Sequence, residues 1–574
     1  MGKSSFLTHD RPGHDELLFL PLGGCNEIGM NLNLFGHRGK WLMVDYGISF
    51  GGDTLPGIDV IMADPDFIEN HQKDIVGLVL THAHEDHLGA IPYIWGDIDC
   101  PIYATPFTAS FLQAKMRESQ FAGKLNLHIM PLNSRFEIGP FDLEYVALTH
   151  SIPEPNGLMI RTKAGNIFHT GDWKIDPDPI VGDKIDEHKL QALRKEGVRA
   201  MLCDSTNALT SGHSISEGEV AKGLNQVIAG CKGKVAVACF ASNIARMRSI
   251  IEAAHASKRK VALVGRSLWR MQEVARTHHY LDGVPPFLNE HEVDDYPDDE
   301  ILLICTGSQG EPRSALTRIA RGDHVIKLGR TDTVIFSSRD IPGNELAIAR
   351  VQNDLARLQV EIITADEYVI HASGHPCRDE LVEMYGLIRP EILVPVHGEP
   401  RHLIAQAKLG KDCQIPHQMV PENGALIDLG GTGKPKQIDL VYSGRLGLSG
   451  EDLLPLDHDS IRHRRQLSQN GIVFVSLCFK SKTRLAHAPK ISVIGLVEPL
   501  KEERTALIDD IDEVVEFTDG KTRHKKAKPT SNHLMVNEAH LDIEERVRRC
   551  VRRFFTHLTG KRPIVIIHSL YQHG

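Results

Sequence analysis

Apolar residues in this chain gather in short runs that end in glycine or in a polar residue. Runs of this length, bounded by turn residues, predict buried β-strands, and strict alternation predicts a strand with one buried face. Glycine-rich turns between neighbouring runs favour hairpins. The expected strands in the first third of the chain are residues 17–24, 31–35, 40–45, 75–80, 141–148 and 166–169.

The middle of the chain, from about residue 209 to residue 366, alternates short apolar strands with helical stretches such as residues 243–257. This alternation is typical of a small parallel sheet with crossover helices. The expected strands are residues 235–239, 260–264, 301–304 and 333–336. A further buried strand at residues 391–396 predicts that the chain then returns to its first sheet system.

The last hundred residues predict a separate small α+β unit. Its expected strands are residues 471–477, 491–496 and 563–567, and residues 543–557 are expected to form a helix in which arginines are interleaved with apolar positions. A basic loop at residues 521–528 could contact phosphate groups, but its composition favours a solvated loop.

Composition narrows the class of protein. The chain has 574 residues, too many for one compact domain, and a formal net charge of -10, which argues against a protein that coats nucleic acid. No apolar run approaches a membrane span, and the N-terminus lacks the apolar core of a signal peptide. The ten cysteines are scattered singly, so we expect a cytoplasmic protein with reduced thiols and no membrane partner.

Residues 81–87 contain the densest grouping of metal-capable and charged side chains in the sequence. They follow the expected strand 75–80 and read Thr-His-Ala-His-Glu-Asp-His. His82 and His84 are two positions apart and point the same way at an extended strand end. A catalytic zinc ion usually takes three protein ligands, so one ion does not easily hold four groups. This pattern favours two metals over a polar loop with chance histidines, with His82 and His84 on one and Asp86 and His87 on the other.

Other strand ends supply similar groups. His150 follows the strand 141–148 and can complete a three-histidine site, and Asp172 follows the strand 166–169 and can bridge both metals. Each residue alone would equally suit a structural loop. Asp45 ends the strand 40–45, where a turn role and a role in orienting the histidine loop are both open.

This order of motifs resembles the metallo-β-lactamase superfamily and, over nearly the whole chain, its β-CASP nucleases, above all the ribonuclease J family. The segments that carry the wider resemblance are residues 202–208, 240–243, 306–312, 337–345, 371–375 and 395–399.

The resemblance implies an α/β fold: a metallo-β-lactamase αββα sandwich with an inserted β-CASP α/β domain and a small C-terminal α+β domain. The implied domains are residues 1–208 and 367–455 for the two parts of the sandwich, 209–366 for the insertion, 456–464 for a linker and 465–574 for the C-terminal domain.

The resemblance also implies the metal ligands and the cofactor. It places His82, His84 and His150 on one ion. Asp86, His87 and His397 hold the other, and Asp172 lies between them. An imidazole-rich set favours two Zn²⁺ per chain, with Mn²⁺ or Mg²⁺ able to substitute in part. Some members of the family also have a calcium-type oxygen site, and the sequence does not decide whether Asp59 belongs to one.

In this family a histidine assisted by an acid protonates the leaving 3′-oxygen, and the motif positions correspond to His375 and Asp204, while Asp86 belongs to the catalytic metal site. His371 lies four residues from His375, and the residues alone do not choose between them. A pocket for the 5′-phosphate and RNA is expected from small and hydroxyl residues in two motifs and from two serines. Its expected members are Ala241, Ser242, Asn243, Ser337, Ser338, His371, Ala372, Ser373, Gly374 and His375.

The implied activity is 5′→3′ exonuclease and endonuclease cleavage of single-stranded RNA, preferably 5′-monophosphorylated, in RNA maturation and decay. The histidine at position 397 points to RNA, because DNA-processing relatives carry valine there. The family implies a homodimer or homotetramer and other RNA-degradation proteins as partners. The competing hypotheses are a small-substrate hydrolase on the same fold, disfavoured by the long insertion, and an inactive scaffold, disfavoured by the filled ligand positions.

Overall fold

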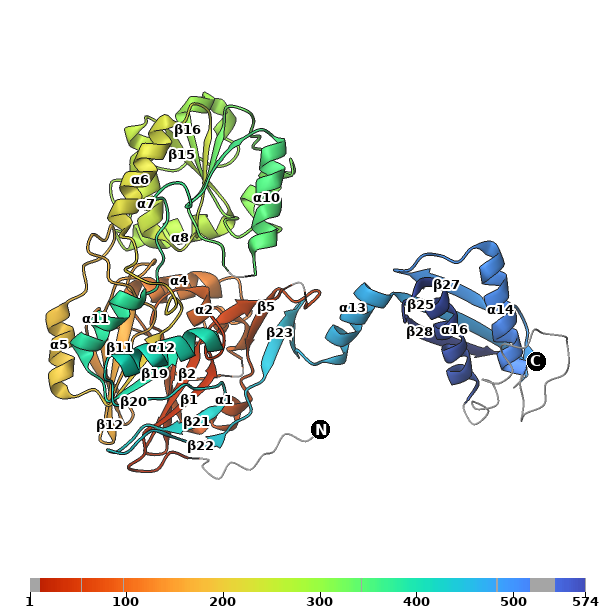
Figure 1. Cartoon of the computed structure of the whole chain (residues 1–574), viewed down its shortest axis with the longest axis horizontal. Coiled ribbons are helices and arrows are strands. Elements are labelled where there is room, and N and C mark those ends of the chain that lie inside the picture. The colour runs from red at the N-terminus through yellow and green to blue at the C-terminus, as the bar shows by residue number, and fades with distance from the viewer. Residues whose placement is uncertain are drawn as a thin grey trace. The chain divides into compact units, whose positions relative to one another are not determined.

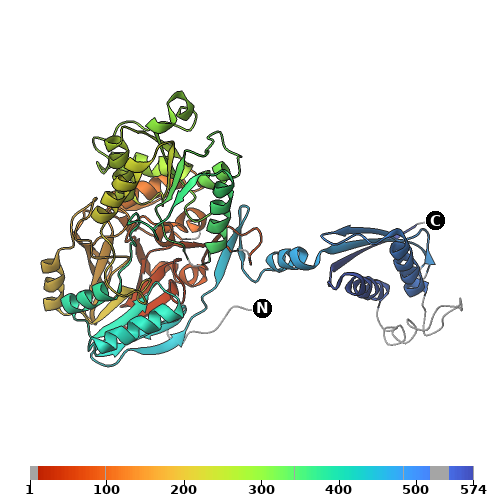
Figure 2. The ribbon, with the colours of Figure 1, turned by 45° about the horizontal axis from the view of Figure 1, so that its top comes forward.

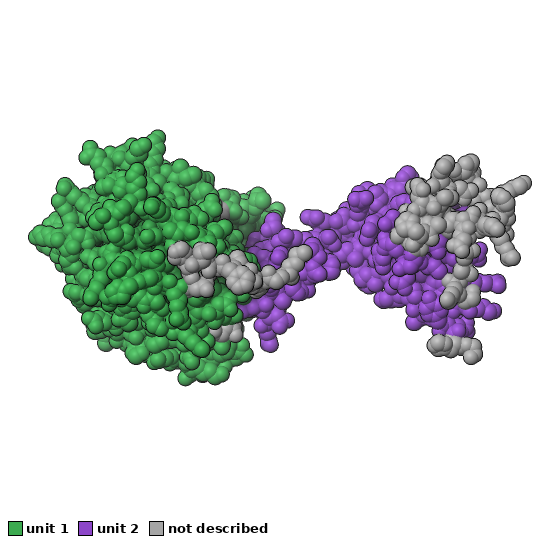
Figure 3. All heavy atoms as spheres, turned by 90° about the horizontal axis from the view of Figure 1, so that it is seen from below, with its two compact units in different colours: residues 1–50, 60–446 green, residues 51–59, 447–574 purple. Residues whose placement is uncertain are grey.

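The computed structural model describes residues 11–52, 54–96, 98–341, 343–481, 484–516 and 542–572. The basic loop 521–528 lies outside these residues. The chain divides into two compact units, Met1–Phe50 with Val60–Leu446 and Gly51–Asp59 with Gly447–Gly574, which Figure 3 colours separately. No helix in the described ranges combines the length and apolar character needed to cross a bilayer.

The centre of the first unit is a sandwich of two sheets. Within the described residues, the first sheet runs in the order β22 (Lys436–Leu440), β21 (Ala425–Asp428), β1 (Leu18–Gly23), β2 (Leu32–His37), β3 (Lys40–Val44), β6 (Ile75–Val79), β7 (Ile102–Ala104), β8 (Leu127–Ile129). The second runs β20 (His417–Gln418), β19 (Ile392–Val396), β13 (Ala200–Asp204), β12 (Gly165–His169), β11 (Asn156–Thr162), β10 (Phe141–Ala147), β9 (Arg135–Ile138).

The core lies between the two sheets because each contributes one apolar face. Phe35 and Leu42 from the first sheet pack with Leu143 and Leu158 from the second, all fully buried. Removing such side chains from water is the main stabilising term for a structure of this kind.

Helices cover the outer faces of the sandwich, which completes the αββα order. On the second sheet these are α5 (Glu187–Glu196), α11 (Arg378–Ile388) and α12 (Pro400–Asp412), visible in Figure 1. On the first sheet Phe67 of α1 (Asp66–Asn70) packs edge-on against Trp41 at 5.4 Å between ring centroids. The expected αββα fold is therefore confirmed.

The inserted domain is a parallel sheet in the order β15 (Lys260–Val264), β16 (Ile301–Cys305), β14 (Val235–Ala238), β17 (Thr333–Phe336), β18 (Glu361–Ile363). Figure 2 shows its strands flanked by helices, among them α6 (Glu217–Gly230), α7 (Ile244–Ala256), α8 (Arg266–Thr277) and α10 (Glu345–Arg357). This parallel sheet was predicted from the sequence pattern, except for the short strand β18, which was not predicted.

The second unit holds a small α+β fold. Strand β25 (Ile472–Ser481) pairs antiparallel with β27 (Lys490–Ile494) and parallel with β28 (Ile564–Tyr571). Helix α16 (Ile543–Thr559) packs against this sheet through the buried side chains of Val547, Val551 and Phe555. Helix α14 (Lys501–Glu516), which was not predicted from the sequence, packs in the same core. Helix α13 (Asp459–Asn470) begins inside the expected linker 456–464 and continues beyond its end, and the domain limits stay a proposal.

Candidate metal centre

The candidate metal ligands meet at one edge of the sandwich. Strands β12, β13 and β19 are parallel neighbours, so their carboxyl ends share that edge. The loop that follows β6 brings the histidine motif to the same place from the first sheet. The residues so placed are His82, His84, Asp86, His87, His150, Asp172, Asp204, His375 and His397.

The first group consists of three imidazoles around one point. His84 Nδ1 lies 3.0 Å from His82 Nε2 and 3.1 Å from His150 Nε2. Asp172 Oδ2 lies 4.0 Å from His82 Nε2 and 3.8 Å from His150 Nε2. Ligand atoms of a tetrahedral zinc ion lie roughly 3.3 Å from one another, so these donors have the spacing of a metal site.

The second group uses the same carboxylate oxygen. His87 Nε2 lies 3.2 Å from Asp172 Oδ2 and 3.6 Å from Asp86 Oδ2. His397 Nε2 lies 3.1 Å from Asp86 Oδ2. Asp172 Oδ2 is therefore close to both groups, which is the arrangement that a bridging carboxylate requires.

Several groups behind the ligands fix their orientation. Asp45 Oδ2 accepts a hydrogen bond from His87 Nδ1 at 2.7 Å and another from the Thr81 hydroxyl at 2.8 Å. His150 Nδ1 donates to the carbonyl of Gly374, and His397 Nδ1 lies 2.8 Å from Thr206 Oγ1. Holding the far ring nitrogen in this way turns the other nitrogen toward the ligand point.

The backbone at the site is crowded and partly strained. Asp45 and His397 have positive φ angles of 62° and 54°, a region that side chains other than glycine rarely adopt. A Cβ on Gly374 would lie 2.5 Å from His150 Cε1, so only glycine lets this chain approach the ligand. Both features are backbone requirements of the loops that form the site.

The two groups differ in charge. Burial and neighbouring imidazoles hold the pKa of His82 well below its usual value, and burial lowers the pKa of His84 to about 4. Burial alone would also lower the pKa of His87, but the carboxylates of Asp172, Asp86 and Asp45 outweigh it and raise that pKa well above its usual value. The first group therefore offers neutral imidazoles, and the second offers carboxylates beside imidazoles.

These residues fit divalent metal ions. Zinc takes imidazole nitrogen and carboxylate oxygen in tetrahedral sets, and in each group here both kinds of donor atom lie within 4.8 Å of one another. In the second group a bound cation would replace the proton that the carboxylates hold on His87. The site is open on one side, because the Asp86 and His375 side chains are 30% and 22% exposed, whereas Asp172 is 3% exposed.

His375 forms a pair with Asp204 beside the ligands. His375 Nδ1 donates to Asp204 Oδ2 at 2.7 Å, which leaves Nε2 free to face a substrate. Burial would lower the pKa of His375, but the charge of Asp204 outweighs it and raises that pKa. His371 does not join this pair: its Nδ1 lies 3.4 Å from Arg246 Nη1 in the inserted domain. The geometry therefore favours His375 for proton transfer.

The residues expected around a 5′-phosphate fall into two sets. Asn243 caps α7 by accepting from the Arg246 N–H, and the Ser337 hydroxyl donates to the Ile370 carbonyl while accepting from Arg246 Nη1. Ser338 is buried and 3.4 Å from the Ser308 carbonyl. These polar groups already have protein partners.

The remaining expected residues lie in loops near the open side. Ala241 and Ser242 are half-buried just before α7, and Ser373 Oγ accepts from the His375 N–H and from Asn207 Nδ2. Ala372 and Gly374 are buried between His371 and His375. Asp59 is exposed and belongs to none of the His and carboxylate groups formed by the described residues.

Three polar residues of the site were not identified from the sequence. Asn31 Nδ2 lies 3.1 Å from His87 Nε2, Thr206 contacts both Asp204 and His397, and Asn156 Nδ2 donates to the Thr81 carbonyl. Asn31 directly precedes β2 and Asn156 begins β11, and only their burial in the fold distinguishes them from other asparagines.

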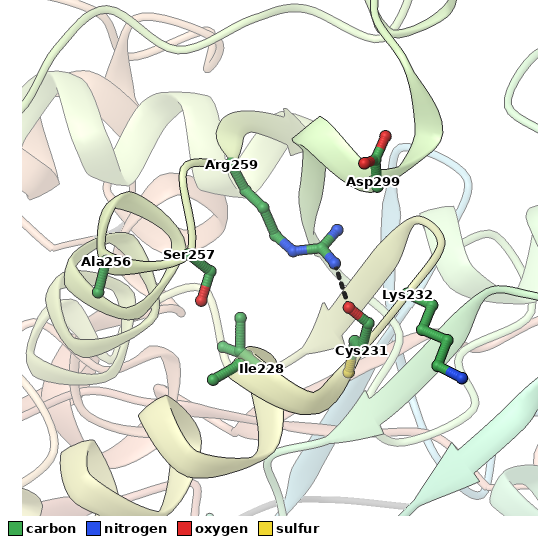
Figure 4. Close-up of a pocket in the computed structure, with 8 residues that line it drawn as sticks. Ile228, Cys231, Lys232, Ala256, Ser257, Arg259 and Asp299 are labelled. Carbon is green, nitrogen blue, oxygen red and sulfur yellow. Dashed lines mark hydrogen bonds between the residues drawn. The ribbon is translucent and has the colours of Figure 1, made fainter.

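The inserted domain has a pocket at the amino-terminal ends of its strands, opposite the carboxyl ends where Ala241, Ser242 and Ser337 lie (Figure 4). The Arg259 guanidinium lines it but donates to the carbonyls of Cys231, Gly233 and Ile301. Arg259 therefore closes the strand ends and is not available to a ligand.

The αββα sandwich with a histidine-rich metal edge and an inserted parallel sheet defines the β-CASP class of the metallo-β-lactamase fold. Family models match the beta-lactamase superfamily domain (residues 53–195), the ribonuclease J beta-CASP domain (232–355), the Zn-dependent metallo-hydrolase RNA specificity domain (360–419) and the ribonuclease J C-terminal domain (459–570). The chain belongs to the ribonuclease J family.

Similar proteins align with this chain over nearly its whole length. A ribonuclease J of Sinorhizobium meliloti is 41% identical over 98% of this chain and 99% of its own length. One from Thermus thermophilus is 37% identical over 96% of this chain and 95% of its own. A crystal structure of a protein of unknown function from Enterococcus faecalis shares the fold, with a TM-score of 0.52 and 15% identity over 72% of this chain and 100% of that one.

Proposed function

We propose that this protein is a metal-dependent ribonuclease that degrades 5′-monophosphorylated single-stranded RNA from its 5′ end and also cuts internally. The observation that carries the proposal is the pair of ligand groups that share Asp172 Oδ2 beside the His375–Asp204 pair. The family's relatives are named ribonucleases, and one matching model is an RNA specificity domain.

His82, His84 and His150 would hold one zinc ion, and Asp86, His87 and His397 the other, with Asp172 shared. When bound, two such ions supply an activated water and neutralise charge on the phosphate oxygens. The chain's own contribution is to present neutral imidazoles at fixed positions and to keep the open side, near Asp86, accessible to the phosphodiester.

His375 would donate the proton that the leaving 3′-oxygen needs. Its Nδ1 hydrogen bond to Asp204 sets the tautomer, and the Thr206 N–H and hydroxyl both donate to Asp204 Oδ1 and fix that carboxylate. A positioned acid of this kind typically contributes about 10²–10⁴ in rate.

The 5′-phosphate would bind at the amino-terminal end of α7, next to Ala241 and Ser242, and at the loop 371–374. A helix amino terminus offers unpaired N–H groups and a favourable dipole to an anion. Burial lowers the pKa of His371, and the charges of Arg246 and Arg339 lower it further, which indicates positive potential in this region.

The test compares single-stranded RNA carrying a 5′-monophosphate with the same RNA carrying a 5′-hydroxyl, in the presence of zinc or manganese. We expect mononucleotides from the first RNA and their loss in the Asp86→Ala, His87→Ala double variant. The matched control is His14→Ala with Asp15→Ala, a hydrogen-bonded His–Asp pair on the surface. No loss of RNA by the unmodified protein with either metal would overturn the proposal.

A cytoplasmic role in ribosomal RNA maturation and messenger RNA decay follows from this activity as part of the same proposal. Assembly into a homodimer or homotetramer, and with other RNA-degradation proteins, stays a prediction. Sedimentation of the purified chain tests the first, and co-purification tests the second.

A further inference from the structure

The loop that carries His150 is tied to the inserted domain through one side chain. Glu154 lies four residues after His150 and adopts a positive φ of 55°. Its Oε1 accepts a hydrogen bond from the Tyr280 hydroxyl at 3.1 Å, and its Oε2 accepts from the Phe107 N–H at 2.9 Å. Tyr280 follows α8 in the inserted domain, whereas Phe107 lies in α4 (Pro106–Met116) of the sandwich.

The contact continues from Glu154 toward the metal ligands. The Glu154 carbonyl accepts from Asn156 Nδ2 at 2.7 Å, and the same amide donates to the carbonyl of Thr81 at 3.2 Å. Thr81 directly precedes His82. Hydrogen bonds at the side chain and at the main-chain carbonyl of Glu154 therefore link the Tyr280 hydroxyl, by way of the His150 loop, to the start of the histidine motif.

The surroundings favour this arrangement. The Tyr280 ring packs edge-on against Phe107, with ring centroids 5.7 Å apart, and Phe107 is fully buried. Burial and the nearby charge of Glu154 raise the pKa of Tyr280, so the hydroxyl keeps its proton and acts as the donor. A hydrogen bond to a carboxylate is stronger than one between neutral groups, particularly away from bulk water.

We propose that Tyr280 is a positioning residue for the metal centre, acting through Glu154 to hold the His150 loop in the geometry that two metals require. The inference rests on the proposed metal-dependent hydrolysis and deepens it. It assigns the inserted domain a part in ordering the metal edge, in addition to any contact that domain makes with RNA.

The matched variants are Tyr280→Phe, which keeps the ring and removes only the hydroxyl, and Ser110→Ala. The Ser110 hydroxyl lies 2.8 Å from His278 Nε2 at the same α4 contact but does not touch Glu154. We expect Tyr280→Phe to lower kcat for RNA roughly three- to tenfold at an unchanged KM, and Ser110→Ala to leave kcat within about twofold.

A second variant, Glu154→Gln, tests whether Tyr280 acts through Glu154. The double variant with Tyr280→Phe should be no slower than Glu154→Gln alone, because residues joined in one network do not act additively. Additive losses would contradict the assignment, since they would mean that the two side chains act separately.

Hydrogen exchange of the intact protein provides a readout that does not depend on activity. Amide exchange in residues 149–156 should be faster in Tyr280→Phe than in the unmodified protein and unchanged in Ser110→Ala. An inactive unmodified protein would overturn the proposed function. An active one in which Tyr280→Phe alters neither kcat nor exchange, or in which Ser110→Ala alters both equally, would overturn only this inference.

Discussion

The sandwich and the inserted sheet both place polar loops at the carboxyl ends of their strands, but the two sets of loops use their polar groups differently. At the sandwich edge, ring nitrogens and carboxylate oxygens face one another within metal-ligand spacing. In the inserted domain the Ser337 hydroxyl and the Arg246 guanidinium bond to each other and to the Ile370 carbonyl.

This difference shows that a position at the end of a strand does not by itself leave a polar side chain available to bind a metal or substrate. The sandwich loops keep their donors oriented by partners behind them, such as Asp45 behind His87, so that the front remains available. In the inserted domain, by contrast, the buried side chains of Arg246 and Glu217 form an ion pair at 3.0 Å, so each charge is already compensated and the pair holds α7 against α6. Four substitutions test this contrast, in order of decreasing effect on activity.

Asp172→Asn should have the largest effect, because one oxygen of Asp172 belongs to both ligand groups. We expect the loss of bound metal and a fall in RNA hydrolysis of at least about a thousandfold. Elemental analysis and single-turnover rates measure both. Asp142→Asn, on β10 and paired with Arg135, is the control. Retention of both metals with a near-normal rate would show that Asp172 does not bridge them.

His375→Ala should come next. Since it removes the proposed acid and no proposed ligand, the rate of cleavage should fall by about 10²–10⁴ while the metal content stays unchanged. His371→Ala is the informative comparison, because His371 contacts Arg246 and not Asp204. A greater loss of kcat in His371→Ala than in His375→Ala would reverse the assignment.

Asp45→Asn should have an intermediate effect. The substitution removes the charge behind His87 but keeps its shape, and asparagine tolerates the positive φ of this position better than most residues. We expect metal affinity to fall by about ten- to a hundredfold, as measured by competition with a chelator. Asp186→Asn, at the N-cap of α5, is the control and should leave affinity unchanged. An unaltered affinity in Asp45→Asn would make Asp45 a turn residue only.

Ser337→Ala should affect activity least. It leaves Arg246 Nη1 without one acceptor, so the free energy of unfolding should fall by about 1–3 kcal/mol, as measured by denaturant titration. The preference for a 5′-monophosphate should stay within about twofold of the original. Loss of that preference at unchanged stability would indicate that Ser337 binds the 5′-phosphate. The polar loops of the inserted domain would then differ less from those of the sandwich.

Strands such as β6 and β19 could be predicted because their apolar runs are short, uninterrupted and bounded by glycine or polar residues, whereas the buried strands β11 and β13 were not predicted. β6 and β19 begin and end within a residue or two of the predicted limits. α14 was missed because its acidic residues interrupt the apolar pattern, although Leu507 and Ile511 lie buried one helical turn apart.

The site was harder to read because its members come from distant segments. His82 and His84 are close enough in sequence to predict their convergence, but Asp204 at the end of β13 and His375 in the loop before α11 are 171 residues apart and meet only in the folded chain. The sequence left His375 and His371 both open as the proposed acid, and the contact of His371 with Arg246 of the inserted domain, which favours His375, appears only in the fold. Burial marks Asn31 and Asn156, and burial of a single asparagine has no sequence pattern.

The long separation of the ligands also affects the biosynthesis of the protein. Asp86 and His397 stand 311 residues apart, with the inserted domain between them. At roughly 5–20 residues per second, the ribosome needs about 15–60 s to pass from one to the other. The early nascent chain carries the histidine motif without His397, so with the proposed ligand set the metal site is complete only after β19 has left the exit tunnel. With that ligand set, a ribonuclease would stay inactive while it is still being synthesised on the ribosome, which is itself built largely of RNA.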